Sequence, residues 1–259
     1  MRAAIEQALI DIEQEQDVRV CLAVESGSRA WGFASLDSDY DVRFIYVHRL
    51  EWYLSVDLET KADTIQQPAG VLDVSGWDAR KALRLFRKSN PPLLEWLQSP
   101  TVYREIGGLA TALRARLPHF YSPRSCAFHY WRMAQGNLRE YLQGDVVWLK
   151  KYLYVLRPLL ALRWIEQGRG PVPMEFARLI DATVTEVDVR SAIDELVAAK
   201  TRGAELDRGP RIGALSDFIE SEMGRAEAWA AAARPEGNAE DDMDSVFREV
   251  LAEAWERTA

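Results

Sequence analysis

Hydrophobic and polar residues follow two different periods along the 259-residue chain. Residues 2–15 place Ala, Ile and Leu between Glu and Gln at helical spacing, which predicts an amphipathic helix. Short apolar, β-branched runs follow at residues 18–24, 42–47 and 72–74. They predict neighbouring strands of one small sheet. Residues 66–70 (Gln-Gln-Pro-Ala-Gly) predict a turn before the third run.

From Gly76 onward the pattern predicts helices almost exclusively. Residues 75–78 (Ser-Gly-Trp-Asp) match a capping box, and Asn90-Pro91 and Ser122-Pro123 each place a capping side chain before a helix-starting proline. The expected helices cover residues 77–88, 91–97, 123–142, 147–166, 186–202, 215–232 and 245–257.

A change from strands to helices along the chain predicts an α+β fold. We expect a first domain over residues 1–120, which holds the sheet. Residues 121–259 are expected to form a mainly helical domain with an acidic C-terminal part. Residues 234–242, which are rich in Pro, Gly and Asn, predict a linker before the last amphipathic helix.

Charge is distributed unevenly along the chain, whose formal net charge is -8. This total argues against a protein that coats nucleic acid through bulk positive charge. Residues 78–170 nevertheless contain 16 Lys and Arg but only six Asp and Glu, which favours a local surface for an anionic partner. Part of this excess lies on one face of a predicted helix, formed by Arg80, Lys81, Arg84, Arg87 and Lys88. This face is either a surface for phosphate or simply a solvated helix face.

Cysteine content and hydropathy bear on the compartment of the protein. Cys21 and Cys126 cannot form a framework of several disulfides, and reduced thiols are the simple expectation, with Cys21 buried in an apolar run. The longest apolar stretch, residues 152–165, is interrupted by Arg157 and Arg163. We therefore expect no membrane span and no secretion signal, and a cytoplasmic location.

A strand, a Gly-Ser turn and two carboxylates stand close together in residues 27–43. Side chains two apart on a strand share a face, so Asp39 and Asp41 are expected to project toward one site. Two close carboxylates repel unless a cation intervenes, and oxygen-only ligation suits Mg²⁺, which also shares substrate phosphates. Gly27-Ser28 can cradle a phosphate because glycine permits a close backbone approach, and Arg29 would add positive charge. Either motif alone is more often a polar turn, and their combination favours a site.

These residues resemble the nucleotidyltransferase superfamily of DNA polymerase beta, whose signature is a Gly-Ser turn followed by Asp-x-Asp on the next strand. Gly27-Ser28, Asp39 and Asp41 match that signature. One branch is similar over longer segments, the bacterial and phage predicted nucleotidyltransferases associated with RNA repair, at residues 27–32, 38–43, 73–81, 88–91 and 150–158. The resemblance spans residues 15–165 and implies a small mixed β-sheet core, similar to the polymerase beta palm, followed by a mainly helical region.

The resemblance also implies a third carboxylate on another strand of the sheet. Asp73 is the candidate, with Asp57 and Asp63 as alternatives. Such a group would bind metal and help to deprotonate the attacking hydroxyl.

A helical element with Lys150, Lys151 and Tyr152 resembles one that contacts triphosphate and base in related enzymes, although Tyr152 is alternatively a core residue. Trp31 is expected to anchor its loop rather than to stack on a nucleobase.

The implied activity is Mg²⁺-dependent transfer of a nucleoside monophosphate from a nucleoside triphosphate, plausibly ATP, to a hydroxyl acceptor such as an RNA end, with Mn²⁺ as an alternative metal. Asp39, Asp41 and Asp73 would be the catalytic metal ligands, and Ser28 would hold the β- or γ-phosphate. Nucleotidylation of a protein or small molecule and a non-catalytic nucleotide-binding module are the alternatives. The metal-dependent activity requires that the carboxylates face one another and that no internal arginine occupies them. Residues 171–259 carry no functional motif.

Overall fold

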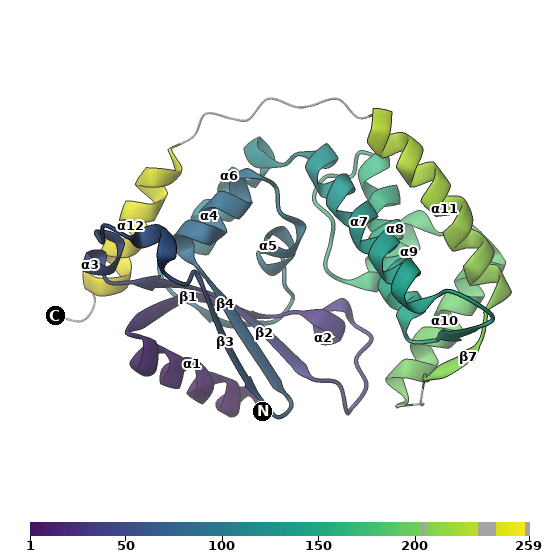
Figure 1. Ribbon diagram of the computed structural model, residues 1–259, viewed down its shortest axis with the longest axis horizontal. Coiled ribbons are helices and arrows are strands. Elements are labelled where there is room, and N and C mark those ends of the chain that lie inside the picture. Colours follow the sequence, from purple (N-terminus) through teal and green to yellow (C-terminus); the bar gives the residue numbers. More distant parts are fainter. Residues whose placement is uncertain (204–205, 233–241, 257–259) are drawn as a thin grey trace. The chain divides into compact units, whose positions relative to one another are not determined.

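The computed structural model describes residues 1–203, 206–232 and 242–256 (Figure 1). Helices and a five-stranded mixed sheet confirm the predicted α+β class. The chain forms two compact units. The first contains residues 1–30, 39–120 and the C-terminal helix, and the second contains residues 31–38 and the chain from Tyr121 to the end of the long helix at Ala232.

A mixed sheet with strand order β3-β4-β2-β1-β5 is the centre of the first unit (Figure 1). The strands are β1 (Val18–Glu25), β2 (Tyr40–His48), β3 (Thr64–Ala69), β4 (Leu72–Asp78) and β5 (Val102–Glu105). β2 and β4 run parallel, and the other neighbours are antiparallel. The parallel register sets Asp41 opposite Asp73, and this pairing positions the candidate site.

Helices cover both faces of this sheet, with α1 on one side and α4 and α6 on the other (Figure 1). The apolar stripe of α1, formed by Ile5, Leu9 and Ile12, is buried in one cluster with residues of β1 and β2, as its periodicity predicts. The helices of this unit are α1 (Arg2–Gln16), α2 (Gly27–Trp31, whose last residue belongs to the second unit), α3 (Leu50–Tyr53), the short 3-10 helix η1 (Leu58–Thr60), α4 (Ala79–Arg87), α5 (Pro91–Trp96), α6 (Leu109–Phe120) and α12 (Met243–Glu256).

Two local predictions in this unit are wrong. β4 continues to Asp78 because its backbone pairs with β2 along its whole length, so residues 75–78 are strand rather than a capping box. Asp78 alone caps α4, where its carboxylate accepts the Arg80 N–H at 2.8 Å. Residues 66–70 were expected to be a turn, but all except Gly70 belong to β3, a polar edge strand that pairs only with β4.

The second unit is mainly helical. Its elements are α7 (Pro123–Tyr141), β6 (Val146–Trp148), α8 (Lys151–Glu166), α9 (Phe176–Thr183), α10 (Val187–Thr201), β7 (Arg208–Pro210) and α11 (Gly213–Ala232). α8 is buried along nearly its whole length and packs against α7, α9 and α11. The predicted start of this helix at Val147 is too early, because residues 146–148 pair with β7 instead.

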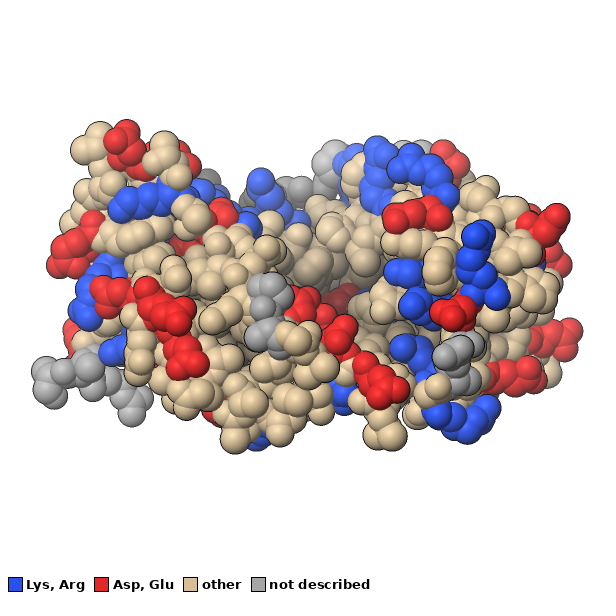
Figure 2. Space-filling model, turned by 60° about the horizontal axis from the view of Figure 1, so that its bottom comes forward, with Lys and Arg blue, Asp and Glu red and all other residues tan. Residues whose placement is uncertain are grey.

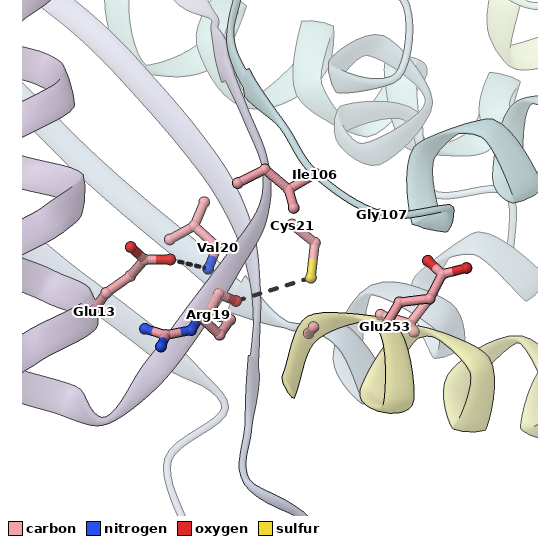
Figure 3. Close-up of a pocket in the computed structure, with 9 residues that line it drawn as sticks. Glu13, Arg19, Val20, Cys21, Ile106, Gly107 and Glu253 are labelled. Carbon is pink, nitrogen blue, oxygen red and sulfur yellow. Dashed lines mark hydrogen bonds between the residues drawn. The ribbon is translucent and has the colours of Figure 1, made fainter. Parts of the chain in front are cut away.

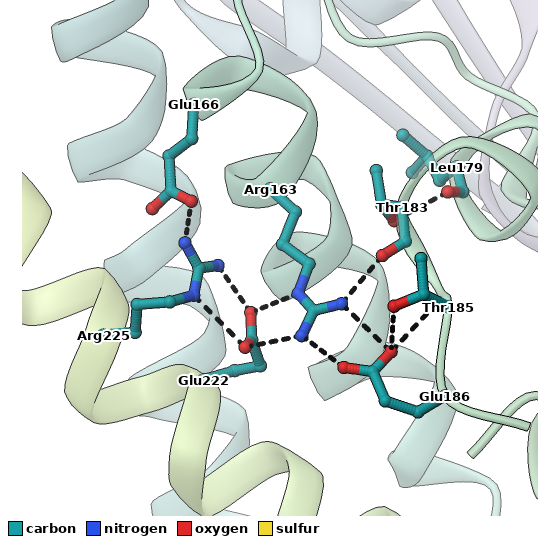
Figure 4. A network of polar contacts seen from close by, with 8 residues as sticks. All are labelled: Arg163, Glu166, Leu179, Thr183, Thr185, Glu186, Glu222 and Arg225. Atoms are coloured by element: carbon teal, nitrogen blue, oxygen red, sulfur yellow. Dashed lines mark hydrogen bonds and ion pairs between the residues drawn. The ribbon is translucent and has the colours of Figure 1, made fainter. Parts of the chain in front are cut away.

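A polar network joins α8 to α11 and to the chain between α9 and α10 (Figure 4). Arg163 on α8 donates to Glu222 at 2.7 Å and to Glu186 at 2.8 Å, and it also donates to the Thr183 carbonyl. Glu222 is 3% exposed and also pairs with Arg225. Both oxygens of the buried carboxylate are paired, which offsets the free energy that burying its charge costs.

The boundary between the units differs from the predicted division at residue 120 in two segments. The second unit begins at Tyr121, but it also includes residues 31–38. The last helix, α12, belongs to the first unit, where the Trp255 indole N–H donates to the His48 carbonyl at 2.9 Å. Helical periodicity marks an amphipathic face but does not identify the core that will cover it. Of the predicted linker at 234–242, only Asp242 lies within the described residues.

α12 also lines a small cavity of about 30 Å³ beside Cys21 (Figure 3). The Cys21 thiol is buried, and burial raises its pKa to about 12. The expectation of a small buried thiol is confirmed, and both cysteines are free. None of the helices in the described ranges combines the length and apolar character needed to cross a membrane.

Candidate active site

Asp41 and Asp73 lie side by side because they are paired residues of parallel strands. Asp63 lies at the far end of β4, where its backbone carbonyl accepts the Asp78 N–H and its carboxylate binds Lys81 at 2.8 Å. Asp78 lies five residues beyond Asp73 on the strand, about 16 Å at the usual rise. Asp57 follows α3, beyond the opposite end of β2 from Asp41. The structure therefore places Asp73 beside Asp41, and it places neither Asp57 nor Asp63 there.

Asp39 immediately precedes β2 rather than lying on it, and its side chain is exposed. Its carboxylate is close enough to Asp41 to contribute to the raised pKa of that residue. Its backbone carbonyl accepts a hydrogen bond from Arg29 Nε at 3.1 Å. Asp39 is thus close to the carboxylate pair and open to solvent.

Gly27 brings the Gly-Ser segment against Asp41. Its φ of 56° belongs to the left-handed region, and a Cβ at this position would overlap the Asp41 carboxylate oxygen Oδ2. The neighbouring Ser26 N–H donates to the Asp41 carbonyl at 2.8 Å, and Ser28 is buried at the start of α2. The two halves of the sequence motif therefore meet in the first unit, and glycine is required at their contact.

Glu25 is part of this site but was not identified from the sequence. It ends β1, is 2% exposed, and accepts the Asp41 N–H at 2.8 Å and the Tyr103 hydroxyl. Burial raises its pKa above the ordinary value for glutamate. The sequence signal that could have identified Glu25 is a carboxylate directly after an apolar run. That pattern alone indicated only where the strand ends. Glu25 fixes the backbone that carries Asp41.

Arg43 is a second residue that the sequence did not assign to the site. Its Nη2 lies 2.7 Å from Oδ2 of Asp73 and 3.1 Å from Oδ1 of Asp41, and Nη1 donates to the Asp73 carbonyl at 2.9 Å. The arginine therefore contacts one oxygen of each carboxylate and holds the two strands together. An internal arginine is the arrangement that the metal hypothesis required to be absent.

Electrostatics around Asp41 show that Arg43 does not fully compensate the carboxylates. Burial raises the pKa of Asp41, and the carboxylates of Asp73 and Asp39 raise it further, while Arg43 opposes the shift. The net result is a pKa above the ordinary value for aspartate. A site with this deficit of positive charge would gain from an additional cation.

The donor set fits a hard divalent cation in its chemistry, because it consists of carboxylate oxygens and Asp73 remains 51% exposed. In the geometry described, however, no cluster of three or more His, Cys, Asp or Glu within residues 1–203, 206–232 and 242–256 is arranged to hold a metal ion. The carboxylates are paired with Arg43 instead. Binding a cation here would require Arg43 to give up at least one of these contacts.

Arg29 was predicted to contact phosphate. Its guanidinium lies over the Tyr40 ring, 3.7 Å from the ring centroid, and its Nε binds the Asp39 carbonyl. These contacts tie α2 to the residues just before and at the start of β2. Arg29 therefore helps to hold the Gly-Ser segment next to the carboxylates.

The predicted nucleotide residues on α8 and just before it belong to the second unit. Tyr152 is buried, and its hydroxyl contacts Ser216 Oγ at 2.7 Å and accepts the Ile212 N–H, so the alternative of a core residue describes it better than a base contact. Lys150 is exposed. Lys151 places its ammonium 4.1 Å from the Tyr141 ring centroid and 4.7 Å from that of Tyr154. Burial and the neighbouring Lys150 lower the pKa of Lys151.

Basic side chains do not gather into a single patch on the face shown in Figure 2, where Lys and Arg are interspersed with Asp and Glu. Within α4, the predicted basic face is also partly committed, because Lys81 binds Asp63 and Thr64. Any anionic ligand on this face would therefore meet local groups of cations rather than a continuous basic surface.

Comparisons with known proteins identify a family for this chain. The model of a family described as the RNA repair pathway DNA polymerase beta family, RlaP, matches residues 1–249. A Bacillus subtilis (strain 168) protein, "Uncharacterized protein YcgL", is 46% identical over 252 residues, which cover 97% of this chain and 95% of that protein. The crystal structure of a nucleotidyltransferase-like protein from Exiguobacterium sibiricum 255-15 aligns with a TM-score of 0.32 and 16% identity, covering 96% of this chain and 88% of the other.

Proposed function

The chain belongs to the RNA repair pathway DNA polymerase beta family, and we propose that it transfers a nucleoside monophosphate from a nucleoside triphosphate, ATP in the first instance, to a hydroxyl acceptor. The observation that carries this proposal is the close approach of Gly27 to the Asp41 carboxylate, with Asp73 paired beside it. The antiparallel pairing of β1 with β2 places the Gly-Ser segment beside Asp41. A phosphate held by this segment would therefore lie next to the carboxylate pair, as phosphoryl chemistry requires.

In the proposed reaction, the acceptor oxygen attacks the α-phosphorus in line, a new P–O bond forms, and the bond to the β-phosphate breaks to release pyrophosphate. Asp39, Asp41 and Asp73 would hold Mg²⁺ or Mn²⁺, which supplies positive charge to the phosphates and acidifies the acceptor hydroxyl. Asp73 is the residue that would take the hydroxyl proton, directly or through water, since it is the more exposed carboxylate of the pair.

Four residues would bind the triphosphate in this proposal. The Gly27 backbone and the Ser28 hydroxyl would contact the phosphate oxygens, and Arg29 would add charge from its position over Tyr40. From the second unit, Lys151 is the preferred cation, since its lowered pKa reports a partly desolvated ammonium that would gain from a phosphate partner.

An RNA end is the acceptor that we favour. The family description names an RNA repair pathway, and the basic excess of residues 78–170 is suited to contacts with a short stretch of RNA backbone. Transfer to a protein or a small molecule uses the same chemistry at the α-phosphorus, so the identity of the labelled product separates these alternatives.

The test is transfer of label from each α-³²P nucleoside triphosphate, with Mg²⁺ or Mn²⁺, to cellular RNA or to a lysate. We expect labelled RNA with the wild-type chain, a loss of at least about 100-fold with Asp41→Asn or Asp73→Asn, and near-normal transfer with Asp63→Asn as the matched control. A labelled protein band would replace the RNA acceptor with a protein. Absence of transfer, or full transfer by Asp41→Asn, would overturn the proposal.

A further inference from the structure

The segment between the Gly-Ser turn and Asp39 is packed into the helical unit. Ala30 and Asp39 belong to the first unit, whereas residues 31–38 belong to the second. The chain therefore leaves the first unit directly after α2 residue Ala30 and returns at Asp39, a candidate metal ligand. Whatever holds residues 31–38 in place also restrains both ends of the motif.

Trp31 is the first contact of this segment. The Arg157 guanidinium lies over the Trp31 ring, 4.6 Å from the centroid, and Tyr154 packs edge-on against the ring at 5.6 Å. Arg157 is only 2% exposed, and its Nη2 donates to the Met174 carbonyl at 3.2 Å. The Trp31 indole N–H is buried and has no acceptor among the described residues, so ring packing holds this side chain.

Phe33 makes the second contact. It is buried, packs against Trp31 at 5.6 Å and meets Phe176 of α9 edge-on at 5.5 Å. Two aromatic side chains, two residues apart, thus anchor the segment on α8 and α9. Aromatic pairs and a desolvated cation over an indole ring are among the stronger contacts that a short loop can make.

The same cluster reaches the candidate triphosphate lysine. Tyr154, which packs on Trp31, also lies beneath the Lys151 ammonium at 4.7 Å. Residues 27–32 and 150–158 are two of the five segments that are similar to the family branch, and within the second unit they meet where Trp31 contacts Tyr154 and Arg157. A burial requirement alone does not explain an arginine at this position.

We propose that Trp31 and Arg157 are positioning residues for the nucleotide site: the Arg157–Trp31 stack fixes the segment that connects Ser28 to Asp39 and orders Tyr154 under Lys151. The proposal rests on the proposed function and adds a determinant of triphosphate binding. Neither residue is assigned a contact with substrate.

The test compares Trp31→Ala with Trp31→Phe, and Arg157→Met with Arg157→Lys. Trp164→Ala is the matched control, because Trp164 lies on α8, has Arg169 over its ring and bonds to the Gly170 carbonyl, with no ring contact to residues 31–38. Each full-length variant is measured for KM and kcat with the triphosphate, for thermal unfolding, and for hydrogen exchange of residues 27–41.

We expect Trp31→Ala to lower kcat/KM about 10- to 100-fold, chiefly through a higher KM for the triphosphate, and to speed exchange over residues 27–41. Trp31→Phe should restore most of the wild-type kcat/KM and of the protection from exchange. Arg157→Lys should reduce kcat/KM less than Arg157→Met does. Trp164→Ala should lower thermal stability without either effect. If Trp31→Ala matches Trp164→Ala in KM and in hydrogen exchange, the positioning role is wrong. If Trp31→Ala does not fold, the same comparison of KM and exchange is made with Arg157→Met and Arg157→Lys.

Failure of the proposed function has a different signature. If the wild-type chain transfers no nucleotide but Trp31→Ala still speeds exchange over residues 27–41 and Trp164→Ala does not, the anchoring stands and the assigned reaction falls. If transfer is normal in every Trp31 and Arg157 variant, the reaction stands and the positioning role falls.

Discussion

Arg43 and Asp73 lie on neighbouring parallel strands, with Arg43 Nη2 2.7 Å from Asp73 Oδ2. The same nitrogen contacts Asp41, so one guanidinium supplies one of the two positive charges that a divalent cation would bring. The carboxylates can remain adjacent without metal because of this contact. It also means that a cation has to compete with a group tethered two residues from Asp41.

Arg43→Gln is therefore expected to bind Mn²⁺ more tightly than the wild-type chain. Loss of a partly exposed ion pair worth about 1 kcal/mol corresponds to roughly a fivefold gain in affinity. Mn²⁺ titration followed by electron paramagnetic resonance measures it. Arg49→Gln, which removes the same charge from an exposed pair with Asp17, controls for net charge and should have little effect. Weaker binding in Arg43→Gln would mean that the arginine organises the ligands instead of competing with the ion.

The raised pKa of Asp41 predicts how stability depends on pH. A carboxyl whose pKa is higher in the folded chain favours folding when protonated, and this contribution is lost as the pH rises through the folded-state pKa. Asp41→Asn, which mimics the protonated form, should accordingly be more stable than wild type at pH 7, and the difference should shrink as the pH falls. Urea unfolding at several pH values measures this, and a difference that grows toward acid would contradict it.

Mn²⁺ binding should show the complementary dependence, because only the ionised carboxylate binds the cation. Affinity is expected to fall on acidification at a higher pH than an ordinary aspartate, with a pKa of about 3.9, would give. Arg43 lowers the pKa of Asp41, so Arg43→Gln should move the midpoint to still higher pH. An unchanged midpoint in this variant would show that Asp41 does not control binding.

Gly27→Ala and Gly168→Ala separate backbone strain from contact with the site. Both glycines have positive φ, so backbone strain alone should cost each variant about 1 kcal/mol of stability. Only the Gly27 Cβ would overlap Asp41, while that of Gly168, which follows α8, meets no heavy atom within 4 Å. Nucleotide transfer should fall about 100-fold or more in Gly27→Ala and stay near wild type in Gly168→Ala. Equal losses in the two variants would refute the close-contact explanation.

Glu222→Gln should destabilise the second unit by about 1–3 kcal/mol, because it removes the carboxylate that pairs with both Arg163 and Arg225, which keep only Glu186 and Glu166 as partners. Glu220→Gln, on the same helix, removes an exposed pair with Arg211 and should cost about 1 kcal/mol or less. Chemical denaturation measures both. Similar costs for the two substitutions would show that the network in Figure 4 contributes no more than surface pairing.

Much of the fold was predictable because it is encoded in neighbouring residues. The apolar stripe of α1, the runs that became β1 and β2, and the caps Asn90 and Ser122 each act within a few residues, and all appear where expected. The missed strands β3 and β5 are short and lie at the two edges of the sheet, where a continuous apolar run is not needed.

The candidate site was predictable only as far as its motif is local. Gly27, Ser28, Asp39 and Asp41 stand within one short segment, and Asp73 was a candidate because it began a later strand. The contacts of Arg43 and Glu25 depend on which strands pair and in which register. Those choices are made by the packing of the whole sheet, and no spacing within the sequence reveals them.

The place of α12 has a consequence for biosynthesis. Residues near the end of the chain, Val250 and Glu253, line the cavity beside Cys21 of β1, and Trp255 binds the end of β2. A ribosome releases the sheet strands long before it releases this helix, so the first unit cannot reach its final packing during translation until the helical unit has also emerged. A strand made before the helical unit is thus completed by a helix made after it.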